Sequence, residues 1–186
     1  MQELIGLGYW RSLQEPALPD PARFVDEQWD AGTRQAVIRY LTQGHPLSSW
    51  MGYSWCRFRC GIANCQMGSG DLTDGTYCWP EGLVHYVQCH AVRLPDAVVE
   101  HILAQPVFPH SKAAQTSEAS PTITTWWAAQ PGWNSAASIF FGESDENERE
   151  YLRRFNQGRV ECNYASEADI EASVRMIRQI RSRELL

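Results

Sequence analysis

The residues best suited to chemistry lie between positions 71 and 90, in the stretch DLTDGTYCWPEGLVHYVQCH. On a helix that begins at Pro80, the side chains of Glu81, His85 and Cys89 would follow one another at intervals of four and share one face. A glutamate and a histidine one turn apart can bind a metal ion together or act as an acid–base pair. Such pairs are also frequent as simple surface contacts on helices. A scaffold role for this corner is therefore the main interpretation, and an active or metal site is the alternative.

Asp74 adds a carboxylate to this corner, in the LTDG segment before the Trp-Pro pair. With Glu81 and His85 it would supply the acid–base or metal-binding groups of a small hydrolase-like enzyme, although aspartate and glycine are also common in turns for conformational reasons. A cysteine nucleophile with a histidine base, such as Cys78 with His85, is a further option. The sequence contains no P-loop, G-x-G-x-x-G, G-x-S-x-G or H-E-x-x-H motif, so the enzyme classes that these motifs mark are not indicated.

A zinc site is the second kind of chemistry that the segment could support, with the candidate ligands Cys56, Cys60, His85 and Cys89. Zinc sites usually contain C-x-x-C, because two residues in a tight turn hold two thiolates at tetrahedral spacing. Three residues separate Cys56 from Cys60, and on one strand their side chains would lie about 13 Å apart. They could share a metal only if that strand ended near Arg57. Because buried free cysteines also serve as small hydrophobic residues, we expect no cofactor, with zinc as the alternative.

Composition and charge restrict the class of protein. The chain of 186 residues suits a single globular domain, 1–186. Its formal net charge of −6 argues against nucleic-acid binding and favours a basic protein partner. The N-terminal residues lack the basic and apolar regions of a signal peptide, and no run reaches the ~18 apolar residues of a membrane span. We therefore expect a soluble cytoplasmic protein with reduced thiols and no membrane contact.

Hydrophobic periodicity predicts an α+β fold, a small antiparallel or mixed sheet packed with four to five helices. Pro80 and Pro95 are each well placed to start a helix, since the first helical position needs no N–H donor. The predicted helices are 30–44, 80–90, 95–105, 144–158 and 166–185, and the strand-like segments are 48–60, 72–79, 124–133, 137–141 and 159–164. Residues 1–22 are expected to form an irregular arm, and residues 106–124 a loop or flap.

The stretch GYSWCRFRCG, followed by LTDGTYCWPEGLVHYV and VRLPDAVVEHIL, resembles a segment of uncharacterised small bacterial proteins. The resemblance covers roughly residues 50–103 and implies a bacterial origin, without an activity attached to it. The spacing from Cys56 to Cys60 is one residue wider than the C-x-x-C that the resemblance implies.

The favoured function is a binding module, an immunity- or antitoxin-like protein that neutralises a toxin by direct binding. Small size, acidity, the lack of a catalytic motif and abundant Trp and Tyr favour this interpretation, because these aromatic residues are strong interface contacts. The residues expected to bind a basic partner are Glu143, Asp145, Glu146, Glu148, Trp126 and Trp127. The alternative is the small metal-dependent or acid–base enzyme with Asp74, Glu81 and His85 at its centre.

Overall fold

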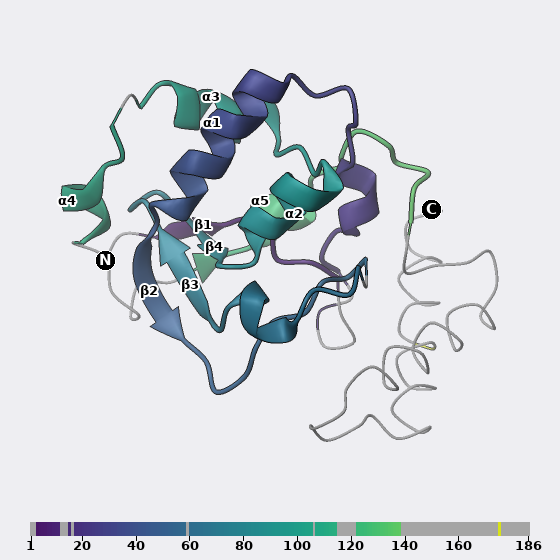
Figure 1. Ribbon diagram of the computed structural model, residues 1–186, viewed down its shortest axis with the longest axis horizontal. Helices are drawn as coiled ribbons and strands as arrows, with labels where there is room; N and C mark the ends of the chain where they lie inside the picture. The colour runs from purple at the N-terminus through teal and green to yellow at the C-terminus, as the bar shows by residue number, and fades with distance from the viewer. Residues whose placement is uncertain are drawn as a thin grey trace.

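The structure is a computed structural model that describes residues 3–11, 15, 17–58, 60–105, 107–114, 122–138 and 175. Within these ranges a mixed five-stranded sheet packs with five α-helices (Figure 1). The predicted α+β fold class is therefore confirmed. No helix in this part of the chain combines the length and apolar character needed to cross a bilayer.

The sheet has the strand order β2-β3-β4-β1-β5. Strands β2, β3 and β4 are antiparallel neighbours, whereas β1 runs parallel to both β4 and β5. The strands are β1 Leu4–Gly6, β2 His45–Ser49, β3 Gly70–Thr73, β4 Tyr77–Pro80 and β5 Thr122–Ile123. The prediction of an irregular arm over residues 1–22 is wrong for β1, which lies inside the sheet. Three residues are too few to show the period-two alternation by which a strand is recognised.

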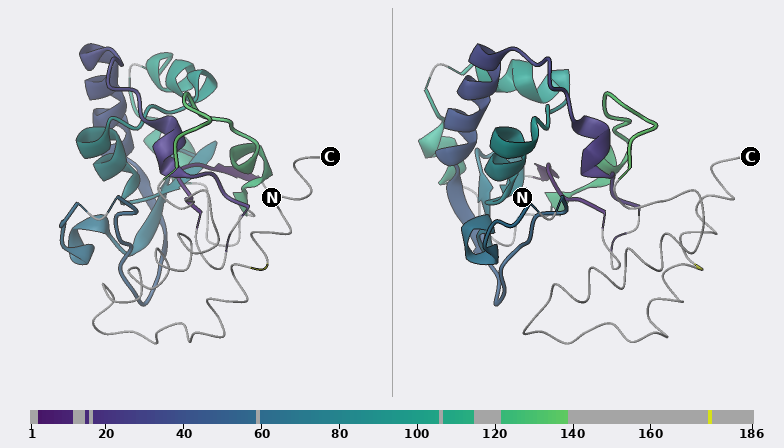
Figure 2. Two further views of the ribbon diagram at one scale, coloured as in Figure 1. Left: turned by 90° about the vertical axis from the view of Figure 1, so that its right-hand side faces the viewer. Right: turned by 45° about the vertical axis from the view of Figure 1, so that its right-hand side comes forward.

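Helices α1, α2 and α3 lie together on one side of the sheet (Figures 1 and 2), and α1 contacts both of the others. The helices are α1 Ala31–Thr42, α2 Leu83–His90, α3 Asp96–Leu103, α4 His110–Ala113 and α5 Thr125–Ala128. The helix predicted at 30–44 is confirmed as α1, although it ends earlier, at Thr42, with Gln43 as its C-terminal cap. Asp30 caps its N-terminus by accepting a hydrogen bond from the N–H of Thr33 at 2.7 Å. Its buried residues Val37, Tyr40 and Leu41 are those that the periodicity indicates.

The predicted strand over residues 48–60 is wrong beyond Ser49. Strand β2 pairs with β3, and the last pair of this ladder joins Ser49 to Gly70, the first residue of β3. Because the partner strand extends no further, residues 50–60 leave the sheet and form an irregular segment, named here the 50–60 loop (Arg59 is not described). Aromatic residues that resemble a strand in sequence therefore belong to a loop.

The prediction that Pro80 starts a helix is also wrong, because Pro80 is the last residue of β4 and pairs with Asp71. A proline is tolerated at the end of a strand, where its missing N–H interrupts no further pair. Helix α2 begins three residues later, at Leu83. Glu81 therefore lies between the strand and the helix.

Two predictions for the last part of the described chain need correction. Residues 124–133 do not form a strand, since Thr125–Ala128 is the helix α5. The expected loop or flap at 106–124 contains helix α4 and strand β5. The remaining predicted elements, 137–141, 144–158, 159–164 and 166–185, lie outside the described residues, apart from 137–138 and the helical Arg175.

A buried carboxylate ties the turn between β3 and β4 to the helices. Asp74 is 1% exposed, and its Oδ1 accepts hydrogen bonds from the backbone N–H groups of Thr76 and Tyr77, each at 2.7 Å. Its Oδ2 accepts a hydrogen bond from the hydroxyl of Tyr40 on α1 and lies against Nε2 of His101 on α3, each at 2.8 Å. The sheet, α1 and α3 are thus connected through one side chain.

Replacing Tyr40 by Phe is expected to lower the free energy of unfolding by about 1–2 kcal/mol, because the buried Asp74 carboxylate loses a hydrogen bond. Urea unfolding followed by circular dichroism measures the difference. The matched control is Tyr53→Phe at an exposed position, which should change stability by less than about 0.5 kcal/mol. Equal stability of the two variants would contradict the structural role of this contact.

Candidate metal centre

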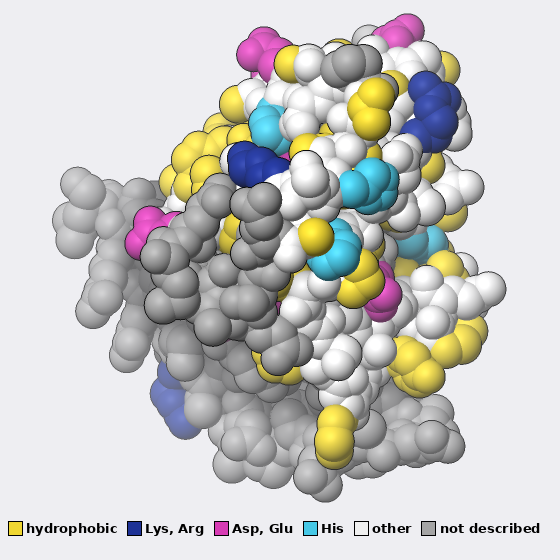
Figure 3. Space-filling view, turned by 90° about the vertical axis from the view of Figure 1, so that its left-hand side faces the viewer, with side chains coloured by type: hydrophobic (Ala, Val, Ile, Leu, Met, Phe, Trp, Pro, Cys, Tyr) yellow, Lys and Arg dark blue, Asp and Glu magenta, His cyan; other side chains and the backbone are white. Residues whose placement is uncertain are grey.

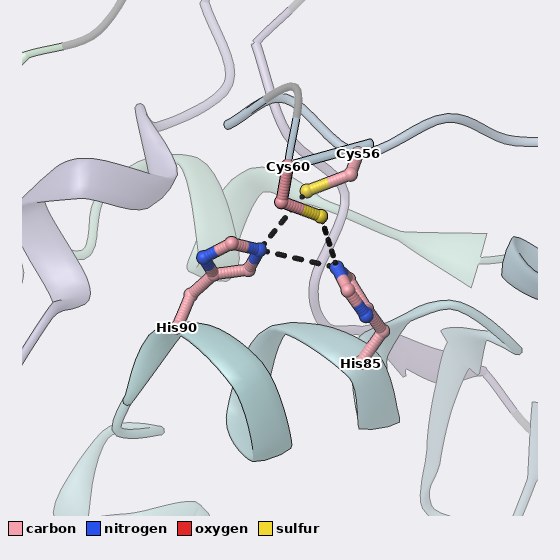
Figure 4. A group of neighbouring side chains, drawn as sticks. All are labelled: Cys56, Cys60, His85 and His90. Atoms are coloured by element: carbon pink, nitrogen blue, oxygen red, sulfur yellow. Dashed lines mark hydrogen bonds between the residues drawn. The ribbon is translucent and has the colours of Figure 1, made fainter. Parts of the chain in front are cut away.

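Four metal-ligating side chains converge at one point: Cys56 and Cys60 from the 50–60 loop, and His85 and His90 from α2 (Figure 4). One ligand atom from each residue lies within 4.8 Å of the other three. The Nε2 atoms of the two histidines are 3.1 Å apart. Cys60 Sγ lies 3.3 Å from His85 Nε2, and Cys56 Sγ lies 3.2 Å from His90 Nε2.

These separations resemble those between the ligands of a tetrahedral zinc ion. Zinc binds nitrogen at about 2.0–2.1 Å and sulfur at about 2.3 Å, which places neighbouring ligand atoms about 3.3–3.8 Å apart. Hydrogen bonding explains the cluster less well. Each histidine Nε2 approaches both a sulfur and the other Nε2, yet a ring nitrogen carries either one hydrogen or one lone pair. A central cation would satisfy all four ligand atoms at once.

Burial favours the protonation states that suit such a site. His85 is 9% exposed, and burial lowers its pKa. Burial and the neighbouring His85 lower the pKa of His90. Both imidazoles are therefore neutral at pH 7, which is the form that binds metals. Burial raises the pKa of the Cys56 thiol to about 11, so this residue becomes a thiolate only when a cation compensates its charge.

The loop ligands are brought together because the 50–60 loop is irregular. Arg57 and Phe58 form a turn between the two cysteines, so the condition under which Cys56 and Cys60 could share a metal is met. Tyr86 of α2 holds this turn, since its hydroxyl accepts a hydrogen bond from the Arg57 N–H at 2.8 Å. The Phe58 ring stacks on His90, with ring centroids 4.3 Å apart. The loop is thus packed directly on the helix that supplies the other two ligands.

The helix ligands depend on the C-terminal end of α2. His90 is its last residue, and the next residue, Ala91, has a left-handed conformation with φ of 50°. Side chains on a helix lean toward its N-terminus, so the imidazole of His90 extends over the turn that carries His85. Arg34 of α1 supports this end of α2 by donating hydrogen bonds to the carbonyl groups of Val87 and Gln88, at 2.8 and 2.5 Å.

The structure therefore brings together three of the four metal ligands suggested by the sequence, Cys56, Cys60 and His85. The fourth place belongs to His90, whereas Cys89 is exposed and outside the group. The interval of four on a helix pointed to Cys89, but it ignores the reach of an imidazole at a helix end. The pattern C-x-x-x-C followed by H-x-x-x-x-H was the signal that could have identified His90.

The candidate catalytic residues do not form a common site. Glu81 lies outside α2, and its Oε2 accepts hydrogen bonds from two backbone N–H groups at the start of β3, at 2.8 and 3.0 Å. Asp74 contacts His101 rather than His85. Histidine side chains, some near a basic residue, gather on the face that looks out from the side of α4 (Figure 3). His85 lies against Cys60 and His90 (Figure 4).

The candidate partner-binding residues are distributed differently from the sequence expectation. Trp127 is fully buried, and its Nε1 donates a hydrogen bond to the carbonyl of Tyr9 at 2.7 Å. It is therefore a core residue, and its proposed place in an interface is withdrawn. Trp126 is half-buried. The four acidic candidates, Glu143, Asp145, Glu146 and Glu148, lie outside the described residues.

Comparison with known proteins identifies no family for this chain, so the interpretation of the site rests on the positions of its side chains. The chain matches no protein-family model, no curated protein and no solved structure. Its resemblance to small bacterial proteins stays a prediction.

Protein purified without chelators is expected to bind one equivalent of zinc, measured by elemental mass spectrometry. His90→Ala should weaken zinc binding by at least about 100-fold, more than the roughly 10–100-fold loss typical of residues that only orient a ligand. Cobalt substituted for zinc should give the visible spectrum of a tetrahedral site with thiolate ligands.

Cys89→Ala is the matched control, because it removes a cysteine that is directly beside His90 but outside the ligand group. This variant should keep full zinc affinity. If Cys89→Ala and His90→Ala lost zinc equally, or if cobalt gave an octahedral spectrum, the proposed ligand set would be wrong.

Proposed function

We propose that this chain is a zinc-binding protein with a structural Cys2His2 centre, which holds the 50–60 loop against α2. One observation carries the proposal: four ligand atoms from two separate segments lie within 4.8 Å of one another. The ligand types support zinc, since thiolate and imidazole together are its usual donors in proteins.

The number of ligands supports a structural rather than a catalytic role. A catalytic zinc ion normally has three protein ligands and keeps one position open for water or substrate. Here four protein side chains are available for a tetrahedral ion. A filled coordination shell leaves no position at which a substrate could be activated.

The 50–60 loop is the part of the chain that such a centre would stabilise most. Outside the cluster, backbone hydrogen bonds tie its first half to the segment before β3: Trp50 N–H to the Ser69 carbonyl at 2.7 Å, and Ser54 N–H to the Gly68 carbonyl at 2.9 Å. Its second half carries both cysteine ligands. The five cysteines in the described part of the chain are free thiols, which supports a reducing location such as the cytoplasm.

Removing zinc with a chelator is expected to destabilise the fold, since a ligand that binds only the native state stabilises it by about 2.7 kcal/mol at 100 times its Kd. Hydrogen exchange measured by mass spectrometry should locate the effect. Residues 50–62 and the end of α2 should lose protection, whereas the first turns of α1 serve as the internal reference. Unchanged exchange in the 50–60 loop after zinc removal would argue against a structural centre.

Protein binding is a second candidate function, and we propose the 50–60 loop as its contact surface. Three large side chains in this loop are strongly exposed: Trp50 at 66%, Met51 at 108% and Tyr53 at 61%. Consecutive exposed hydrophobic residues on a fixed loop are typical of interaction sites. The formal charge of −6 supports a basic protein as the partner. An immunity- or antitoxin-like activity is the specific form of this proposal.

Met51→Ser is expected to weaken binding of a basic partner protein by about 5- to 30-fold, because an exposed apolar contact of roughly 1–2 kcal/mol is lost at the interface. Copurification from the source cells, followed by affinity measurement on the isolated pair, provides the test. The control is Leu103→Ser, an exposed apolar residue on α3. If Leu103→Ser weakened the complex as much as Met51→Ser, the contact surface would lie elsewhere.

A further inference from the structure

A cavity of about 340 Å³ lies beside the 50–60 loop, and none of the four candidate metal ligands is among its lining residues. Its volume is within the range of about 300–1,000 Å³ that is typical of small-molecule sites. Aromatic side chains dominate its walls: Tyr9, Trp10, Trp50, Tyr53, Trp55 and Tyr86. The segment that follows β1, the start of β3 and the 50–60 loop thus line a space to which neither the zinc proposal nor the protein-binding proposal assigns an occupant.

A buried carboxylate gives this cavity negative charge. Asp71 lines the cavity and is only 8% exposed. Its Oδ2 already accepts hydrogen bonds from the Ser48 hydroxyl at 2.9 Å and from the Trp50 Nε1–H at 3.2 Å. Glu15 contributes a second carboxylate to the lining. Asp71 therefore places a negative charge at the wall of the cavity, on a carboxylate whose Oδ2 oxygen is already hydrogen-bonded.

One wall of the cavity already carries a cation on an aromatic ring. The Arg57 guanidinium lies over the Trp55 ring, 3.8 Å from its centroid. Its nitrogen atoms donate hydrogen bonds to the backbone carbonyl groups of Arg11 and Trp55, both at 3.3 Å. Arg57 is thus part of the wall, and its contact shows that the Trp55 ring face holds a positive charge.

We propose that this cavity binds a small organic cation of the quaternary ammonium class. Aromatic faces attract a cation through the ring quadrupole, and Asp71 adds a nearby full negative charge. A primary ammonium or guanidinium group would need several hydrogen-bond acceptors, whereas a quaternary ammonium needs none. A lining with six aromatic residues and only two carboxylates matches this second requirement better than the first.

The test is a titration of the full-length protein, with its zinc content measured, by isothermal calorimetry. Choline is the probe, and 3,3-dimethyl-1-butanol is its neutral control, because the two have the same shape but differ in charge. Choline should bind saturably with a Kd of about 1 mM or below. The neutral compound should bind at least 10-fold more weakly. Equal binding of both compounds, or no saturable binding of choline below about 10 mM, would overturn the proposal.

Variants separate the cavity from the surrounding loop. Tyr53→Ala should weaken choline binding by about 2- to 5-fold, the usual effect of one exposed cation–π contact. Tyr53→Phe should restore it, because the ring remains. Met51→Ala is the matched control, since Met51 is exposed on the same loop but does not line the cavity. An equal loss in Met51→Ala and Tyr53→Ala would show that choline binds outside the cavity.

The outcome is distinguishable from that of the zinc proposal. Cys56 belongs to the loop that forms one wall of the cavity, so loss of zinc could change the cavity. The choline titration is therefore repeated after zinc has been removed with a chelator. Choline binding by protein that never contained zinc would support the cavity and reject the metal centre. Zinc binding without choline binding would do the reverse.

Discussion

A histidine ring nitrogen can satisfy one close polar neighbour, and the arrangement around α2 depends on this limit. His85 and His90 each place Nε2 near a cysteine sulfur and near the other ring. Without a cation, the four groups would compete for too few hydrogens and lone pairs, with Cys56 and His85 buried. With a cation, the same positions become a closed coordination shell. The proposed metal centre would therefore explain why an irregular loop packs so closely on this helix.

The end of α2 is held from several directions, which makes it a suitable platform for two ligands. Arg34 of α1 binds its last carbonyl groups, and the buried residues Leu83, Tyr86 and Val87 pack it into the core. The 50–60 loop, which packs against this end of α2, contains no helix or strand among its described residues. The loop is joined to the helix where the cysteines meet the histidines, where the Arg57 N–H donates to the Tyr86 hydroxyl, and where Phe58 stacks on His90. The difference between the packed helix and the irregular loop explains why we assign the metal a structural role for the loop.

The same loop joins the metal centre to the aromatic cavity. Tyr86 accepts a hydrogen bond from the Arg57 N–H, while the Arg57 side chain stacks on Trp55. A change in the position of Cys56 would therefore be transmitted within one or two residues to the cavity wall. The buried carboxylates have separate tasks: Asp71 faces the cavity, and Asp74 connects the hairpin turn to α1 and α3. Potentially reactive side chains that lie close together in the sequence therefore belong to three separate parts of the fold: the candidate metal centre, the cavity and the hairpin turn.

Local patterns in the sequence were sufficient for helices α1 and α3, where the apolar periodicity coincides with the buried face of the structure. They also supplied the α+β class and the candidate ligands Cys56, Cys60 and His85. The strand β1, the end of β2 at Ser49 and the start of α2 at Leu83 could not be read locally. Each depends on where a partner strand begins or ends, which is a property of distant residues. His90 entered the site for the same reason, because only the packing of the loop on the helix end decides which side chains face a common point.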